Sequence, residues 1–256
     1  DDHHDLLEEV LPAHKTARVF FHGSSLVRAK MCNFVGNRCR HSAKFYPTLA
    51  TVVGAEDGGG GRSPLTTIAA VVVDCCGDSD PATRKFACFA VGNAAFHDAS
   101  LYALLSPAIP ALKRALHDVD DKTRANASGA LGNLGRNSGE LAKAMAAQHV
   151  PHAILQIVLT GNGGDGTSSP EAEADYATFG SQSPNISSKR TALFSLGTLA
   201  AYASCRDSLL SCKHPSLHDL FDRVALMGKG GPGVDETLTK YLIRLKTKLK
   251  SRSQPL

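Results

Sequence analysis

The chain has 256 residues, of which 43% are hydrophobic, only 6% are aromatic and none is Trp, and its formal net charge is +4. This length suits one large domain or a short solenoid, and the composition favours closely packed helices over a β-sandwich. The longest apolar run, residues 68–73, is far shorter than the ~20 residues of a membrane-spanning helix. The mild charge does not by itself require nucleic acid as a partner.

The cysteines indicate a reducing compartment. Their number, seven, is odd and no CxxC pair is present, so we expect free thiols, which behave as small hydrophobes when buried. Neither Cys39 with His41 nor the pair Cys75-Cys76 has the spacing of a zinc site. The chain opens with an acidic segment, Asp1 to Asp5. We therefore expect a cytoplasmic chain with no signal peptide, metal or cofactor of its own.

In chain order, the first element is a helical pattern at Leu6, Leu7, Val10 and Leu11. An amphipathic helix buries its apolar side against a neighbour. No earlier segment supplies that neighbour, so we expect the chain to be a fragment of a longer protein. The next segment, RAKMCNFVGN, recurs three more times with changes. The four copies are Arg28–Asn37, Arg84–Asn93, Arg124–Asn133 and Lys189–Thr198.

A period of about 40 residues organises these copies. The aligned Gly92 and Gly132 are 40 residues apart, which is the period of armadillo and HEAT repeats. The other spacings are longer because polar stretches rich in Gly and Ser interrupt them at 55–64 and 161–188. Such a composition cannot bury enough apolar surface to become ordered. We therefore predict both stretches to be disordered insertions.

Each copy is followed by shorter helical patterns. Asp80 is suited to cap a helix that begins at Pro81. Asp118 to Asp121 close that unit and cap the next long helix, from Thr123 onward. Further apolar patterns at helical spacing lie at 101–105, 107–116, 141–147, 150–159, 205–212 and 217–227. The sequence therefore predicts a unit of one long helix and two short ones.

A glycine stands at the same position in every copy, as Gly36, Gly92, Gly132 and Gly197. Inside a helix a glycine costs ~1 kcal/mol relative to alanine. A cost that recurs at one position predicts close packing between neighbouring repeats. The alternative is that these glycines merely lie near helix ends.

The chain ends with a linker and a capping helix. Residues 228–233 lack the Lys-Ser/Thr ending of a phosphate loop and are predicted to be a linker. The predicted helix at 234–250 has Leu238, Leu242 and Leu245 on one side and basic residues on the other, as a terminal repeat requires. Together the patterns predict an all-α fold. It is an armadillo/HEAT-type right-handed superhelical solenoid of about four to five repeats, spanning residues 1–256 as one domain.

Three adjacent motifs carry a family resemblance. They are Val27–Tyr46, Asp80–Leu105 and Asp120–Ser138. Their sequences and order resemble the C-terminal armadillo region of the Fused serine/threonine kinases, which are called two-in-one in plants. The resemblance covers about residues 24–210, and the two polar insertions depart from it.

The resemblance implies a non-catalytic regulatory region joined to an N-terminal protein kinase, and ATP and magnesium would belong to that kinase alone. This chain contains no HRD or DFG motif and no strand-borne glycine-rich loop, so we expect it not to be an enzyme. Family members act in Hedgehog signalling and assembly of motile cilia in animals, and in cytokinesis with kinesins at the phragmoplast in plants. Kinesins or ciliary and microtubule-associated proteins are the implied partners. The implied location is the cytoplasm, at the cytoskeleton, cilium or phragmoplast.

In peptide-binding armadillo proteins an Asn on the third helix of each repeat pairs with the backbone of an extended peptide, because an amide both donates and accepts. The matching positions here are Asn37, Asn93, Asn133 and Thr198. Importin-like grooves carry a Trp four residues earlier. This chain has Asn33, Phe89, Gly129 and Phe194 there, which argues against importin-style reading of basic peptides. The alternative for the Asn residues is that they tie helix ends together.

Basic residues give two further candidate surfaces. Arg28, Arg84, Arg124 and Arg190 recur near the start of the repeated helix. They could face acidic partner residues in the groove, or form packing contacts and salt bridges between repeats. The basic tail comprises Lys240, Arg244, Lys246, Lys248 and Lys250. It could touch acidic tubulin surfaces, nucleic acid or anionic lipid, or it could be a solvated helix face.

Three binding hypotheses therefore follow from the sequence. The first is a scaffold region of a Fused-type kinase, which binds proteins. The second is a free-standing armadillo adaptor without a kinase. The third is an importin-like transport receptor, which the missing Trp residues weaken.

Overall fold

The computed structural model describes residues 15–16, 19–20, 24–53, 66–160, 186–211, 216–226 and 235–250. Outside these ranges lie the predicted helical pattern at 6–11, the insertion at 55–64, most of the insertion at 161–188, and the linker at 228–233. The described residues divide into two compact units, Asp1–Ala111 and Leu112–Leu256.

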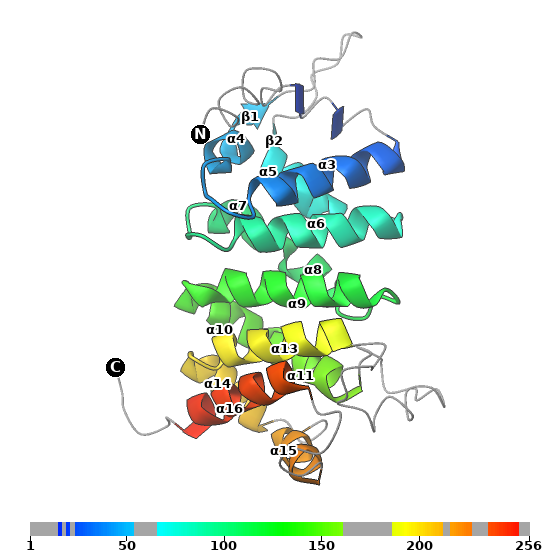
Figure 1. The fold of residues 1–256 in the computed structure, drawn as a ribbon. Helices are drawn as coiled ribbons and strands as arrows, with labels where there is room; N and C mark the ends of the chain where they lie inside the picture. The colour runs from blue at the N-terminus through cyan, green and yellow to red at the C-terminus, as the bar shows by residue number, and fades with distance from the viewer. Residues whose placement is uncertain are drawn as a thin grey trace. The chain divides into compact units, whose positions relative to one another are not determined.

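The first unit is built on two long helices that pack against each other, α3 (Ser25–Arg38) and α6 (Pro81–Ala94) (Figure 1). Both carry copies of the repeated segment. Shorter elements complete the unit: α4 (Tyr46–Ala50), β1 (Val52–Val53), β2 (Thr66–Thr67), α5 (Ile68–Cys75), α7 (Tyr102–Leu105) and the 3-10 turn η1 (Ser106–Ala108). Helix α8 (Ile109–Ala115) spans the end of this unit and the start of the next.

The second unit repeats the arrangement. Helix α13 (Ile186–Leu199) packs against α9 (Asp121–Arg136) on one side and α16 (Glu236–Lys250) on the other (Figure 1). The shorter helices are α10 (Gly139–Ala147), α11 (Val150–Thr160), α14 (Ala203–Ser211) and α15 (Leu217–Leu226). All four repeated segments thus lie on long helices, which confirms the repeat that the sequence predicts.

Aspartates start α6 and α9, as the sequence predicts, and also α16. The Asp80 carboxylate accepts hydrogen bonds from the Thr83 backbone N–H at 2.8 Å and from its hydroxyl at 2.7 Å. Asp120 accepts the same pair of bonds from Thr123 at 3.0 and 2.8 Å. At α16, Asp235 accepts from the Leu238 N–H at 2.9 Å. Each cap satisfies a backbone donor that the first helical turn leaves without a partner.

Two local features differ from the prediction. Residues 186–188, which the sequence assigns to the second insertion, begin α13. They are held there because the Ser188 N–H donates to the Asp121 carboxylate at 3.2 Å and Ser188 is fully buried. In addition, β1 and β2 pair antiparallel, with Val52 opposite Thr67. Their β-branched residues favour extended backbone.

The recurring glycine has different neighbours in different copies. A Cβ on Gly36 would lie 2.4 Å from the Phe89 ring, and one on Gly132 would lie 2.8 Å from Cβ of Ser195. These approaches are closer than atoms tolerate, so the predicted close packing between repeats is confirmed at both positions. At Gly197 the nearest atom, on Arg244, would be 3.6 Å away, which is ordinary van der Waals contact.

Candidate partner-binding surface

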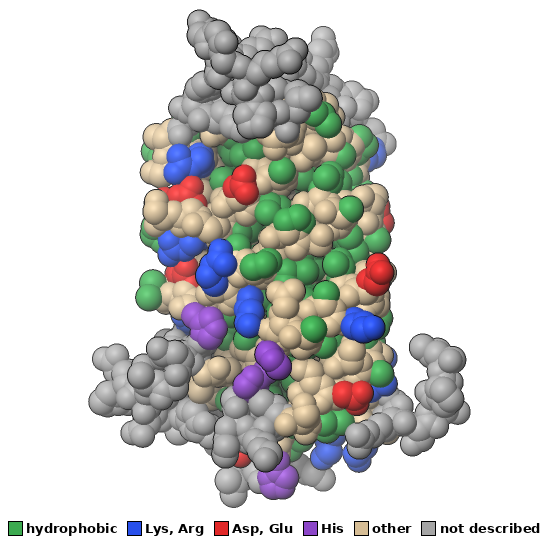
Figure 2. Space-filling model, turned by 180° about the vertical axis from the view of Figure 1, so that it is seen from behind, with side chains coloured by type: hydrophobic (Ala, Val, Ile, Leu, Met, Phe, Trp, Pro, Cys, Tyr) green, Lys and Arg blue, Asp and Glu red, His purple; other side chains and the backbone are tan. Residues whose placement is uncertain are grey.

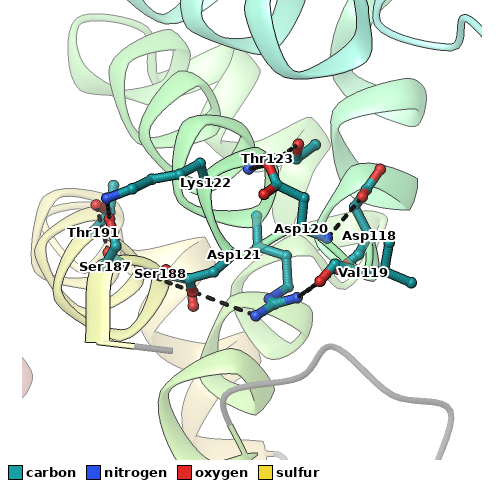
Figure 3. A network of polar contacts seen from close by, with 10 residues as sticks. Asp118, Val119, Asp120, Asp121, Lys122, Thr123, Ser187, Ser188 and Thr191 are labelled. Atoms are coloured by element: carbon teal, nitrogen blue, oxygen red, sulfur yellow. Dashed lines mark hydrogen bonds and ion pairs between the residues drawn. The ribbon is translucent and has the colours of Figure 1, made fainter. Parts of the chain in front are cut away.

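The repeated arginines hold the loops that precede the long helices. Arg124 Nη1 donates to the carbonyl oxygens of Asp118 and Val119 at 2.6 and 3.0 Å, and Nη2 forms an ion pair with Asp121 at 3.4 Å (Figure 3). Its side chain is 2% exposed. The structure therefore does not place Arg124 where the sequence suggests a partner contact. It instead agrees with the alternative, a packing role.

The same bonding pattern occurs at two other arginines. Arg84 Nη1 donates to the carbonyl oxygens of Asp78 and Ser79 at 3.0 and 2.9 Å. Arg206 on α14 donates to Ala200 and Ala201 at 2.9 and 2.8 Å. In each case the acceptors precede the arginine by six and five residues. Arg206 lies outside the repeated segment, and sequence reasoning missed it because backbone carbonyls leave no side-chain pattern.

Ion pairs join neighbouring long helices. In the first unit Arg28 of α3 donates from Nε to the Asp78 carboxylate, just before α6, at 2.8 Å. In the second unit Arg190 of α13 bonds the Asp235 carboxylate at the start of α16, with Nε 3.1 Å away. Both contacts agree with the alternative of salt bridges between repeats.

The ion pairs predict a loss of stability in acid. The Arg190 guanidinium and the Leu238 N–H hold the pKa of Asp235 below its ordinary value, although burial opposes them. A carboxyl with a depressed folded-state pKa stabilises the fold above its unfolded pKa of ~3.9, and that contribution disappears as pH falls through the folded value. Asp235→Asn should therefore reduce stability at pH 7 and flatten the acid limb of the stability curve. Urea unfolding between pH 7 and 3 measures this.

A matched substitution controls for the change of charge. Asp207 is exposed on α14, so Asp207→Asn removes the same charge from the second unit without breaking the bond to Arg190. An equal acid response of wild type and Asp235→Asn would show that the ion pair contributes no pH-dependent stability.

The three predicted asparagines have different environments. Asn93 donates from Nδ2 to the Gly36 carbonyl at 2.8 Å, and its own carbonyl accepts from the Tyr46 hydroxyl at 3.2 Å. It therefore ties α6 to α3, as the alternative holds. Asn37 is exposed and donates to the carbonyl oxygen of Asn33 in its own helix, at 3.0 Å. Asn133 is half-buried on α9. A role for Asn37 and Asn133 in binding a peptide stays a prediction.

The aromatic positions also differ between the units. In the first unit the half-buried Phe89 lies against the backbone of α3 at Gly36. In the second unit Phe194 meets the Tyr241 ring edge-to-face, with centroids 5.3 Å apart. The Arg244 guanidinium carbon lies 5.0 Å from the centroid of Phe194. An arginine on α16 thus covers an aromatic ring on α13.

The basic tail forms the outer face of α16. Leu238, Leu242 and Leu245 are buried as predicted. The basic residues are all exposed; they are Lys240, Arg244, Lys246, Lys248 and Lys250. On the side opposite to the view of Figure 1, basic and acidic side chains are interspersed with apolar ones (Figure 2). On α16 itself, the charged residues that follow Glu236 are all basic.

Two of the buried thiols are held protonated by burial. Cys32, Cys39, Cys75, Cys76, Cys88 and Cys205 are free and buried. Burial raises the pKa of Cys205 to about 11 and that of Cys39 to about 12, so both remain protonated thiols at neutral pH. Within the described residues no group of His, Cys, Asp and Glu side chains could hold a metal ion. No helix among them is long and apolar enough to cross a membrane.

Curated proteins similar to this chain are kinases of much greater length. Over 136 residues, 53% of the chain, it is 33% identical to serine/threonine-protein kinase 36 of Mus musculus. Over the same length it is 29% identical to the protein of that name from Pongo abelii. The chain spans about 9% of these relatives. No family model matches the chain.

Solved structures similar to this chain establish the fold. An engineered protein aligns with 93% of the chain at a TM-score of 0.63 and 14% identity, with 48% of that protein covered. A designed armadillo repeat protein in complex with the peptide (KR)4 aligns with 95% of the chain at a TM-score of 0.54 and 12% identity, with 93% of that protein covered. The predicted all-α, armadillo-type solenoid is confirmed.

Proposed function

We propose that this chain is a non-catalytic protein-binding scaffold from the regulatory region of a Fused-type serine/threonine kinase. The observation that carries the proposal is the 33% identity over 136 residues to serine/threonine-protein kinase 36, in a chain that folds as armadillo-type repeats. Repeats of this kind present long helices side by side, and their exposed faces suit extended partners.

The charged and polar groups of the repeated helices support a scaffold role. Arg84, Arg124 and Asn93 bond backbone carbonyls within their own unit. These bonds fix the loops and helix spacing, so the exposed side chains are presented from a rigid support. A rigid surface loses less conformational entropy on binding than a mobile one.

The partner class follows from the family resemblance. We propose kinesins or ciliary and microtubule-associated proteins as partners, and a cytoplasmic location at the cytoskeleton, cilium or phragmoplast. Sequencing the transcript upstream of Asp1 tests the family link, because a Fused-type protein carries a kinase domain in frame before its helical region. A start codon immediately before Asp1 would contradict it and leave a free-standing adaptor.

Selection from a displayed peptide library tests the scaffold role. The whole chain, immobilised, should enrich a set of related peptide sequences. Their binding should weaken in Phe194→Ala, which removes a half-buried aromatic ring, and persist in Leu210→Ala, which removes an exposed apolar side chain from α14. Failure to enrich any related sequences, from a chain that shows a cooperative thermal transition, would count against peptide binding.

A further inference from the structure

Helices α13 and α16 make a mixed aromatic and basic surface in the second unit, where they lie side by side (Figure 1). Phe194 on α13 meets Tyr241 and Arg244 on α16. The Arg244 stem passes over Gly197, where its Cδ would lie 3.6 Å from an added Cβ. The stem of Arg244 thus lies at ordinary van der Waals distance from α13 at this position.

Arg244 changes which ligand charge this surface accepts. In a groove that binds basic peptides, aromatic rings receive the ligand's cations through cation–π contacts. Here the guanidinium of Arg244 lies over the ring of Phe194. A lysine or arginine of a ligand would therefore meet a like charge. A guanidinium that stacks through its face keeps its N–H groups at its edges, where they match a carboxylate in a bidentate fork.

Other charges extend the positive surface along α16. Lys240, Lys248 and Lys250 are exposed on this helix. Glu236 in its first turn is the acidic residue of the helix. Asp235, which immediately precedes the helix, is 3% exposed and pairs with Arg190. It is therefore buried inside the fold, and the outward charge of α16 is positive.

An exposed apolar residue favours a peptide over a polyphosphate. Ile243 is 63% exposed on the same outer face as Lys240 and Arg244. A side chain of a peptide can cover Ile243 and so remove apolar surface from water. A nucleic acid backbone or lipid headgroup would use only the charges.

We propose that the surface centred on Phe194, Tyr241 and Arg244, and continued by Lys240 and Ile243, binds an acidic segment of a partner protein. This inference rests on the proposed scaffold function and names the charge of its ligand. Ligand carboxylates accept hydrogen bonds from Arg244 and Lys240, and a ligand apolar side chain lies on Ile243. The preference is opposite in sign to that of the designed armadillo protein bound to (KR)4.

Fluorescence anisotropy of the whole chain with labelled octapeptides tests the ligand charge. One peptide alternates glutamate and leucine, the other lysine and leucine, so both have the same apolar content. We expect the acidic peptide to bind at least about tenfold more tightly at low salt, and its binding to weaken as salt is added. A labelled octathymidylate, which carries phosphates and bases that can stack on aromatic rings, serves as the nucleic-acid comparison and should bind more weakly than the acidic peptide.

Two charge reversals on one helix test the location. Arg244→Glu should weaken the acidic peptide by about tenfold or more. Lys246→Glu makes the same change of charge, but Lys246 lies over Phe221 of α15, 5.7 Å from its centroid, and should weaken binding less than about threefold. Arg244→Gln removes the positive charge without adding a negative one, so it should show an intermediate loss of affinity for the acidic peptide. Thermal melts establish that each variant is folded.

Several results would overturn the inference. Tighter binding of the basic peptide would reverse the ligand charge while leaving the scaffold role intact. Tighter binding of octathymidylate would replace the peptide by a polyphosphate ligand. Equal losses of affinity in Arg244→Glu and Lys246→Glu would show that the peptide responds to the net charge of the chain and not to this surface. Failure of both peptides would remove this surface as a binding site, while the library selection would still decide whether the chain binds peptides elsewhere.

Discussion

Replacing Gly132 with alanine should lower the free energy of unfolding by ~2 kcal/mol, although alanine is the better helix former by ~1 kcal/mol. The new Cβ would lie 2.5 Å from Oγ, 2.8 Å from Cβ and 3.1 Å from Cα of Ser195. The hydroxyl can rotate away, but the Cβ and the backbone cannot. Helices α9 and α13 must therefore separate, which loosens the packing along their whole contact.

Thermal unfolding followed by circular dichroism measures this change. At roughly 2–4 °C per kcal/mol for a chain of this size, the midpoint should fall by about 4–8 °C. Gly197→Ala is the matched control, because it lies at the aligned position of the next copy and its Cβ would have 3.6 Å of space. That variant should gain up to ~1 kcal/mol from helix propensity. A similar change in the midpoint at both positions, in size and in sign, would contradict the packing argument.

The repeat and its caps could be predicted because they depend on local order in the sequence. Asp80 before Pro81, or Asp120 three residues before Thr123, specifies a helix start without reference to any distant residue. The apolar spacing within each copy likewise specifies a helix. These features required no knowledge of which helices lie side by side.

The direction in which each side chain points could not be predicted in the same way. Arg124 and Arg190 occupy similar positions near the start of their helices, yet Arg124 is buried against loop carbonyls while Arg190 reaches Asp235. The contact of Phe194 with Arg244 joins two helices from different kinds of segment, so aligning the copies with one another cannot reveal it. The neighbour of Gly197 differs from that of Gly132 for the same reason.

Replacing Arg124 with alanine should destabilise the second unit by ~3 kcal/mol. The guanidinium donates to the carbonyl oxygens of Asp118 and Val119 and pairs with Asp121 (Figure 3). Because its side chain is 2% exposed, its removal leaves a cavity and withdraws the donors from those carbonyls. Arg124→Lys should recover only part of the loss, since an ammonium cannot reproduce the fork that spans two carbonyls and a carboxylate.

Arg206→Ala is the matched control, because Arg206 makes the same pair of bonds to carbonyls six and five residues before it, within the same unit. It is half-buried, so water can replace the lost donors, and we expect a loss of ~1 kcal/mol. Urea unfolding of the three variants compares the two sites. If Arg206→Ala costs as much as Arg124→Ala, the bonds themselves and not their burial determine the stability. A loss below ~1 kcal/mol at Arg124 would mean that the loop before α9 keeps its conformation without the arginine. The contacts of Arg124 would then result from the fold without stabilising it.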